Sequence, residues 1–251
     1  MRTPLRSAIA LTCAVGLACG LAACGAVPAM PPSARTDYIP ADAEPATIEE
    51  AQGNLTKYGF SEAQRMAVRV RNVGCSSVTR GTGFAIDSRT LITNKHVVAG
   101  TEQLQLNSFD GRDIAVTNSS VAAIADLALV RTEEDLDAFP VVAEKDPKIG
   151  DSLTIVGYPN GGALTVTSGV ALEYTEDPLN ENLGEVLLSD APVEFGSSGS
   201  AVLDDEGRLV GVVYAKNSQN HSYIIPLSTL EDILTQDKGF QPQKAATCDN
   251  R

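Results

Sequence analysis

The chain has 251 residues and a formal net charge of −13, with no tryptophan and only two histidines. So acidic a chain is a poor candidate for nucleic-acid binding, which requires clustered lysine and arginine. The scarcity of imidazole also restricts acid–base chemistry by histidine to His96 and His221.

The first 23 residues have the composition of a secretory signal. Arg2 and Arg6 give a basic start, acidic residues are absent, and an apolar stretch of small and aliphatic side chains occupies residues 7–23. A retained membrane-spanning helix is the alternative, but this stretch is shorter than the roughly 20 apolar residues that a span requires. We therefore expect residues 1–23 to be a cleaved signal peptide.

The signal ends in Leu21-Ala22-Ala23-Cys24, which resembles the lipobox of bacterial lipoproteins. In that motif the cysteine is acylated and becomes the first residue of the mature chain. Cys19 is a weaker candidate because Gly16 stands where the motif has leucine, and a simple cleaved signal with an incidental cysteine is the other alternative. The resemblance implies a lipid anchor at Cys24 that holds the protein at the extracytoplasmic face of a bacterial cell membrane.

Residues 24–60 contain several prolines and alanines and few large apolar side chains, so we expect a flexible tether followed by one folded domain over 61–251. Because two cysteines leave with the signal and Cys24 carries lipid, Cys75 and Cys248 remain. A disulfide between them is the economical interpretation in an oxidising compartment, and two free thiols are the alternative.

Short apolar runs follow one another through residues 66–226, separated by Gly, Asp, Asn and Pro; examples are TGFAI, LALVR, LTIVGY and LVGVVYA. This spacing predicts an all-β barrel or sandwich. Few helices are expected. One should begin after Pro226, where Ser228 and Glu231 have capping-box spacing, and another should lie near Ser61.

Four motifs then occur in order: GTGFAID, LITNKHVV, DLALV and GSSGS. Together, over about residues 75–234, they resemble the trypsin-like serine peptidase superfamily in its bacterial HtrA-like and related branches. The resemblance implies a chymotrypsin-like fold of two six-stranded antiparallel β-barrels, the first at about 66–145 and the second at about 146–226. A short C-terminal helix and tail would occupy 227–251, and we expect no PDZ domain.

The resemblance also implies the roles of individual residues. His96 would be the general base, Asp126 its orienting carboxylate and Ser198 the nucleophile, while the backbone amides of Gly196 and Ser198 would form the oxyanion hole. Each of these residues alone has an ordinary structural interpretation, such as a strand-edge carboxylate or a turn serine. Their occurrence together in the family's order favours a catalytic triad that needs no cofactor and no metal.

Two departures from the family pattern concern neighbouring residues. The common ending SGGP is SGSA in this chain, so Ser200 replaces a glycine. Ser197 stands where digestive members have an aspartate that pairs with a newly cut amino terminus. We therefore expect an enzyme that needs no zymogen cleavage of that kind.

Specificity is less evident from the sequence. The family's pocket maps onto residues 192–195 and 212–216, and Pro192 replaces the aspartate of trypsin-like members, so a strong preference for Arg or Lys is unsupported. His221 could approach the pocket, although a surface or structural role is its simpler interpretation. A small or apolar substrate side chain is the default. The acidic run 132–139 is interpreted as a solvated loop rather than a cation site, and residues 204–207 as a hairpin turn.

Two functions follow from this pattern. The first is a secreted, lipid-anchored serine endopeptidase that cleaves protein or peptide substrates through an acyl-enzyme. The second is a catalytically silent lipoprotein of the same fold that binds a protein partner or a peptide without cutting it.

Overall fold

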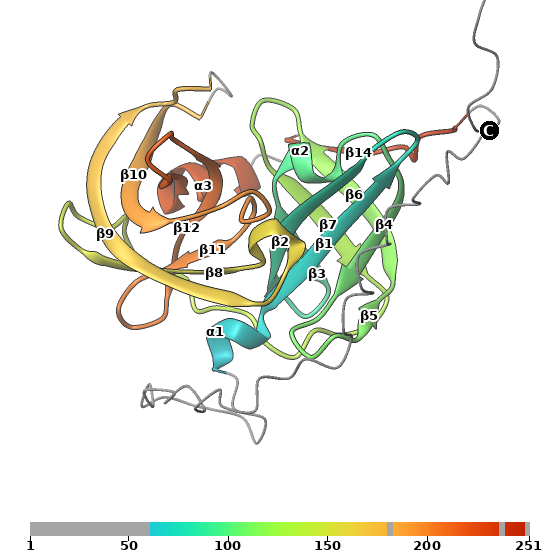
Figure 1. Ribbon diagram of the computed structural model, residues 1–251, viewed down its shortest axis with the longest axis horizontal. Coiled ribbons are helices and arrows are strands. Elements are labelled where there is room, and N and C mark those ends of the chain that lie inside the picture. Colours follow the sequence, from blue (N-terminus) through green and yellow to red (C-terminus); the bar gives the residue numbers. More distant parts are fainter. Residues whose placement is uncertain (1–60, 180–182, 236–238, 249–251) are drawn as a thin grey trace, which may run out of the picture. The chain divides into compact units, whose positions relative to one another are not determined.

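The structure is a computed structural model that describes residues 61–179, 183–235 and 239–248 (Figure 1). The predicted signal 1–23, the lipidation residue Cys24 and the tether 24–60 lie outside these residues. None of the helices in the described ranges is long and apolar enough to cross a membrane.

The first half of the domain is an antiparallel sheet of eight strands. In the order of the sheet they are β14 (Phe240–Pro242), β6 (Val116–Ala122), β7 (Ala128–Thr132), β3 (Thr90–Thr93), β2 (Val78–Asp87), β1 (Ala67–Gly74), β4 (Thr101–Asn107) and β5 (Asp113–Ile114). Two short helices accompany the sheet, α1 (Glu62–Arg65) and α2 (Lys95–Val98).

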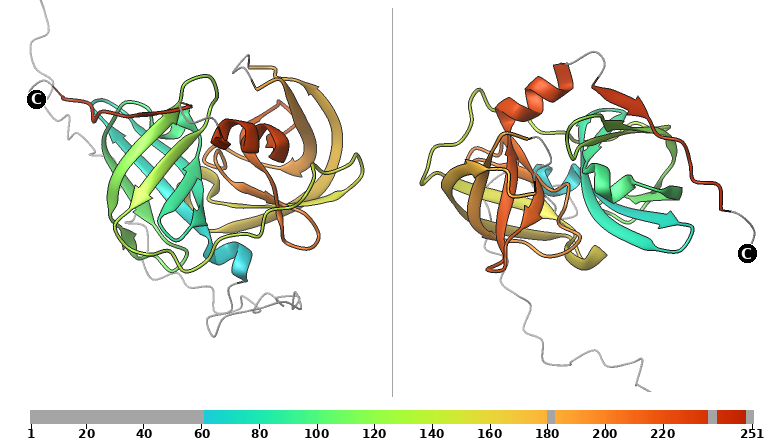
Figure 2. Two further views of the ribbon diagram at one scale, coloured as in Figure 1. Left: turned by 180° about the vertical axis from the view of Figure 1, so that it is seen from behind. Right: turned by 90° about the horizontal axis from the view of Figure 1, so that it is seen from above.

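The expectation of six strands is therefore wrong for the first half. The C-terminal tail adds β14 along the edge of β6, and the two-residue β5 extends the other side of the sheet (Figure 2). Pairing of the tail is understandable physically, because an uncovered strand edge leaves backbone donors and acceptors without partners. The disulfide between Cys75 and Cys248 ties the same tail to the end of β1, with the two Cα atoms 5.3 Å apart. The pairing expected from the cysteine count is thus confirmed.

The second half is a closed barrel of six strands, as the sequence predicts. Its order is β10 (Glu185–Pro192), β13 (His221–Pro226), β12 (Leu209–Lys216), β11 (Ala201–Leu203), β8 (Ser152–Gly157) and β9 (Thr165–Glu176). A short 3₁₀ turn, η1 (Pro159–Gly161), follows β8. Leu187, Val202 and Ile224 are fully buried inside the barrel.

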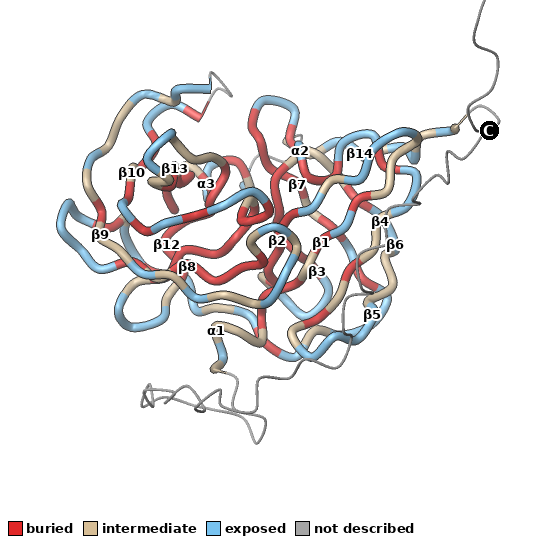
Figure 3. Tube along the Cα trace, viewed as in Figure 1, coloured by how far each residue is buried: buried red, intermediate tan, exposed pale blue. Residues whose placement is uncertain are grey.

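A shared apolar core joins the two halves (Figure 3). Phe84 and Ile92 of the first half belong to the same buried cluster as Val156 and Tyr158 of the second. Burial raises the pKa of Tyr158 to about 12, and the Arg69 guanidinium lies 5.1 Å from the centre of its ring.

The helix predictions have two outcomes. A helix does begin after Ser61, where Ser61 Oγ accepts from Gln64 N–H at 3.3 Å and Gln64 Oε1 accepts from Ser61 N–H at 2.9 Å. The last helix, α3, spans Leu227–Thr235, but the expected capping box is wrong. Because α3 already begins at Leu227, Ser228 lies inside its first turn, and Asp146 from a distant loop accepts both Ser228 N–H at 2.9 Å and Ser228 Oγ–H at 2.6 Å.

Candidate active site

The pairing of β3 with β7 brings His96 and Asp126 together. Thr93 lies opposite Ala128 in this antiparallel pair, so the residues that follow Thr93 run beside the residues that precede Ala128. His96 then lies in α2, and Asp126 lies just before β7. Two motifs that are 30 residues apart in sequence thus meet at one end of the sheet.

Asp126 binds both the backbone and the ring of His96. Its Oδ1 accepts from His96 N–H at 2.9 Å, and its Oδ2 lies 2.6 Å from His96 Nδ1. The Asp126 side chain is only 7% exposed, whereas that of His96 is 46% exposed. Since a carboxylate can only accept hydrogen bonds, a neutral His96 ring in this contact carries its proton on Nδ1 and its lone pair on Nε2.

The backbone of Asp126 is fixed as well. Its carbonyl accepts from Asn94 Nδ2 at 2.8 Å, and Asn94 is completely buried immediately before α2. The general base that the sequence predicts is therefore held at the backbone and at one ring nitrogen, so the ring can present its other nitrogen to a substrate.

Ser198 lies on the other half of the domain, in the loop 193–200 between β10 and β11, which we call the serine loop. Ser198 lines a cleft of about 680 Å³ that His96 and Asp126 also line. Of the three serines in the loop, Ser197 and Ser200 are buried and Ser198 is half-buried. Within the described ranges, Ser198 Oγ makes no hydrogen bond to His96.

Three backbone amides of the serine loop have no acceptor in the described part of the chain, those of Phe195, Gly196 and Ser198, and the last two belong to the residues predicted to form the oxyanion hole. The Phe195 carbonyl accepts from Asn160 N–H, so in this planar trans peptide the Gly196 N–H points away from Asn160. Ser197 N–H donates to Glu194 O at 2.9 Å. Two unpaired N–H donors beside a serine hydroxyl suit the negative oxygen of a tetrahedral intermediate.

Glycine is required at position 196 for two reasons. Its φ is +92°, which is a conformation that residues with a side chain rarely adopt. A Cβ at this position would also lie 2.8 Å from both Asn160 N and Tyr158 O. The tight packing of Gly196 against the turn after β8 could not be predicted from the sequence.

An ion pair that the sequence analysis missed connects the two walls of the cleft. Lys216 Nζ lies 2.7 Å from Glu194 Oε2 and donates to Asn220 Oδ1 at 2.7 Å. Asn220 Nδ2 donates in turn to Glu194 Oε1 at 3.1 Å, and the Phe195 ring lies 5.1 Å from Lys216 Nζ. The two charges that face each other across this part of the cleft therefore compensate one another.

Deeper in the cleft the lining is apolar, with Val193, Val213 and Tyr214 all buried. Tyr214 Oη–H donates to Asp177 Oδ1 at 2.8 Å, and burial together with this bond raises the pKa of Tyr214. His221 does not line the cleft, because it lies opposite Pro192 in the barrel wall. The structural interpretation of His221 is thus the one that the geometry favours.

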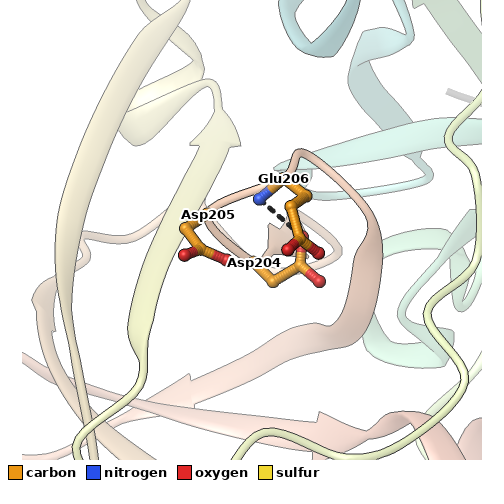
Figure 4. Close-up of side chains that lie close together, drawn as sticks. All are labelled: Asp204, Asp205 and Glu206. Atoms are coloured by element: carbon orange, nitrogen blue, oxygen red, sulfur yellow. Dashed lines mark hydrogen bonds between the residues drawn. The ribbon is translucent and has the colours of Figure 1, made fainter.

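The acidic turn after β11 also has the form that the sequence predicts, a hairpin connection to β12. Asp204 accepts from Glu206 N–H at 3.0 Å (Figure 4), and its other oxygen accepts from Arg208 Nε at 2.8 Å. Arg208 pairs with Glu206 as well. Since this guanidinium already binds two of the carboxylates, Asp204 and Glu206, we assign no metal to the cluster.

The acidic run 132–139 makes similar contacts. Asp135 lies 2.6 Å from Arg89 Nε, and Asp137 lies 3.3 Å from an Arg112 nitrogen. Two exposed arginines therefore pair with carboxylates of this loop.

Two packed antiparallel β units, with a His–Asp pair on one and a serine loop with free amides on the other, define the chymotrypsin-like double-barrel class. A family model described as the trypsin-like peptidase domain matches residues 81–212, more than half of the chain. The chain belongs to this family, and its fold is the all-β double barrel with a short C-terminal helix that the sequence predicts.

Similar proteins include the serine protease Rv3671c of Mycobacterium tuberculosis, which is 27% identical over 86% of this chain and 56% of its own length. A probable periplasmic serine endoprotease, DegP-like, of Hahella chejuensis is 27% identical over 63% of this chain and 35% of its own length. The chain thus spans about half or less of these relatives. The crystal structure of the active form of the Rv3671c protease has a TM-score of 0.64 at 25% identity, covering 74% of this chain and 86% of that one.

Proposed function

We propose that the chain is a serine endopeptidase that cleaves protein or peptide substrates through an acyl-enzyme. The observation that carries this proposal is the 2.6 Å contact between His96 Nδ1 and Asp126 Oδ2 at the edge of a cleft that Ser198 also lines. In the proposed reaction, Ser198 is the nucleophile, His96 the general base and Asp126 the orienting carboxylate.

In the first half of the reaction, Ser198 Oγ attacks the substrate carbonyl carbon while His96 Nε2 takes the hydroxyl proton. Asp126 stabilises the imidazolium that forms. The carbonyl oxygen becomes an oxyanion and accepts hydrogen bonds from the N–H groups of Gly196 and Ser198. Loss of one such donor typically lowers kcat by about 10²–10³. The C–N bond then breaks, and His96 gives the proton to the leaving amine.

In the second half, water attacks the acyl-enzyme in the same way. His96 Nε2 takes a proton from the water, a second tetrahedral intermediate forms, and the bond to Ser198 Oγ breaks as His96 returns the proton. The product is a free carboxylic acid, and the enzyme regains its starting state.

The serine loop needs no cleavage of the chain in this proposal. Ser197, at the place of the aspartate of digestive members, is buried and accepts from Glu194 N–H at 3.3 Å through its own Oγ. Contacts within the domain support the conformation of the loop, so activation by a new amino terminus is not required.

We further propose that the protein is lipid-anchored through Cys24 at the extracytoplasmic face of a bacterial cell membrane. The lipobox-like sequence before Cys24 supports this, as does the disulfide, which is typical of oxidising compartments. A relative whose name places it in the periplasm is in agreement. Metabolic labelling with a palmitate analogue should mark the wild-type protein and leave Cys24→Ser unmarked; equal labelling of both would exclude Cys24.

The alternative is a partner-binding protein without catalysis. It draws on one observation, the missing hydrogen bond between Ser198 Oγ and His96 in the described residues. Incubation with an unfolded protein substrate separates the two functions. We expect the wild-type protein to produce fragments and Ser198→Ala to produce none. Binding of the same substrate by both proteins without any fragment would favour the alternative.

A further inference from the structure

Thr82 connects the serine loop to the first half of the domain. It lies in β2, is fully buried, and its hydroxyl bonds in two directions. Thr82 Oγ1–H donates to Gly196 O at 2.8 Å, and the same oxygen accepts from Tyr158 N–H at 2.9 Å. A hydroxyl is a suitable group here, because it can donate once and accept as well.

The backbone of Thr82 holds the loop at a second point. Its N–H donates to Ser198 O at 2.8 Å. Gly196 and Ser198 each carry an unpaired amide, so Thr82 binds the carbonyls of both residues that supply the proposed oxyanion donors.

The carbonyl of Thr82 faces the other proposed catalytic residues. It accepts from Thr93 Oγ1–H at 2.7 Å, and Thr93 is the last residue of β3. Asn94, the next residue, binds the backbone of Asp126, and His96 follows in α2. A continuous path of buried hydrogen bonds and short chain segments therefore runs from the serine loop through Thr82 to the His96–Asp126 pair.

We propose that Thr82 is a positioning residue that sets the serine loop against His96. The inference rests on the proposed peptidase function and adds to it a residue outside the triad and the oxyanion hole. Replacing the hydroxyl by a methyl group would leave Gly196 O and Tyr158 N–H buried without this partner, so the loop would shift to find others. A shift of about 1 Å at reacting groups can cost about 100-fold in rate.

The test compares Thr82→Val and Thr82→Ser with Thr132→Val. Valine keeps the shape of threonine and removes the hydroxyl, whereas serine keeps the hydroxyl. Thr132 is the matched control because it is also buried in the first sheet and its Oγ1–H donates to Glu134 O at 2.8 Å, outside the cleft. The measurements are kcat and KM on a peptide substrate, the rate of inactivation by a fluorophosphonate, and the melting temperature.

We expect Thr82→Val to lower kcat and the inactivation rate by about 10- to 100-fold, with KM within about twofold of wild type. Thr82→Ser should recover most of the rate. Thr132→Val should lose thermal stability and keep its kcat. If Thr82→Val loses only stability, as the control does, the inference is wrong.

Should Thr82→Val fail to fold, Thr82→Cys takes its place, because a thiol is a weaker hydrogen-bonding group of similar size. A kcat equal to wild type in folded Thr82→Cys would overturn the inference. If the wild-type protein neither cleaves peptide nor reacts with the fluorophosphonate, the proposed function fails and this inference falls with it. An active wild type with an unaffected Thr82→Val overturns the inference alone.

Discussion

The two halves of the domain hold their parts of the site by different means. The eight-stranded sheet of the first half places His96 and Asp126 through side-chain hydrogen bonds at the ends of β3 and β7. The closed barrel presents Ser198 on a loop whose shape depends on a positive φ at Gly196 and on partners outside the loop, namely Thr82 and Asn160. Activity should therefore be sensitive to the side-chain chemistry of His96 and Asp126 in the first half. In the serine loop it should be sensitive to side chains that the backbone conformation and close packing do not allow.

The largest effect is expected from Asp126→Asn, which changes side-chain chemistry in the first half. An amide in place of the carboxylate can donate to His96 Nδ1 and so favour the wrong tautomer, which should lower kcat by about 10⁴. Circular dichroism should show an unchanged fold. A turnover within tenfold of wild type in this variant would contradict the assigned role of Asp126.

The next largest effect is expected from Gly196→Ala, which adds a side-chain atom where the backbone of the serine loop is closely packed. The new Cβ would meet Asn160 N and Tyr158 O at 2.8 Å, and alanine tolerates a φ of +92° poorly. We expect the Gly196 amide to be displaced and kcat to fall by about 10²–10³. Gly207→Ala is a suitable control, since Gly207 also has a positive φ but a Cβ there would meet no atom within 4 Å. Equal kcat losses in both variants would mean that the serine loop has no special role.

A smaller effect, on specificity, is expected from the ion pair across the cleft. Glu194→Gln leaves the Lys216 ammonium uncompensated, so peptides with an acidic side chain before the scissile bond should gain about tenfold in kcat/KM relative to apolar ones. Lys216→Met should shift the preference toward basic side chains. The double variant should return to the wild-type order. The preference of the wild type, the two single variants and the double variant can be measured on a peptide library. The same preference in all four proteins would mean that the ion pair does not determine specificity.

The fold class and the triad candidates could be predicted from the sequence, whereas the contacts that support them could not. The motifs around His96, Asp126 and Ser198 are short and occur in a fixed order along the chain, so they can be found in the sequence. Strand pairing then brings two of these motifs together, because Thr93 of β3 lies opposite Ala128 of β7. Contacts between distant side chains leave no such pattern. Thr82 and Gly196 are 114 residues apart, and Ser228 and Asp146 are 82 apart. Neither a period nor a motif relates the members of these pairs.

Strand β14 of the first sheet could not be predicted for the same reason, since it depends on contacts between distant segments. Residues 240–242 have no strand pattern of their own, and β14 forms because β6 offers an edge and the disulfide holds the tail nearby. The ion pair between Lys216 and Glu194 likewise depends on the meeting of the end of β12 with the serine loop.

The smallest effect is expected from Ser200→Ala in the serine loop. Ser200 is fully buried, and its Oγ has no hydrogen-bond partner among the described residues. Removing an unpaired buried hydroxyl should leave kcat unchanged and raise the free energy of unfolding by about 1 kcal/mol. Denaturant unfolding measures this change. A loss of stability would mean that the hydroxyl does have a partner.

The proposed function depends above all on the activation of Ser198 as a nucleophile by His96. The most direct measurement is reaction of the folded protein with a fluorophosphonate probe, followed by peptide mapping of the adduct. We expect one equivalent of probe on Ser198, no labelling of Ser198→Ala, and strongly slowed labelling of His96→Ala. Folded wild-type protein that stays unlabelled, or that carries the adduct on Ser197 or Ser200, would contradict the assignment of Ser198 as the nucleophile.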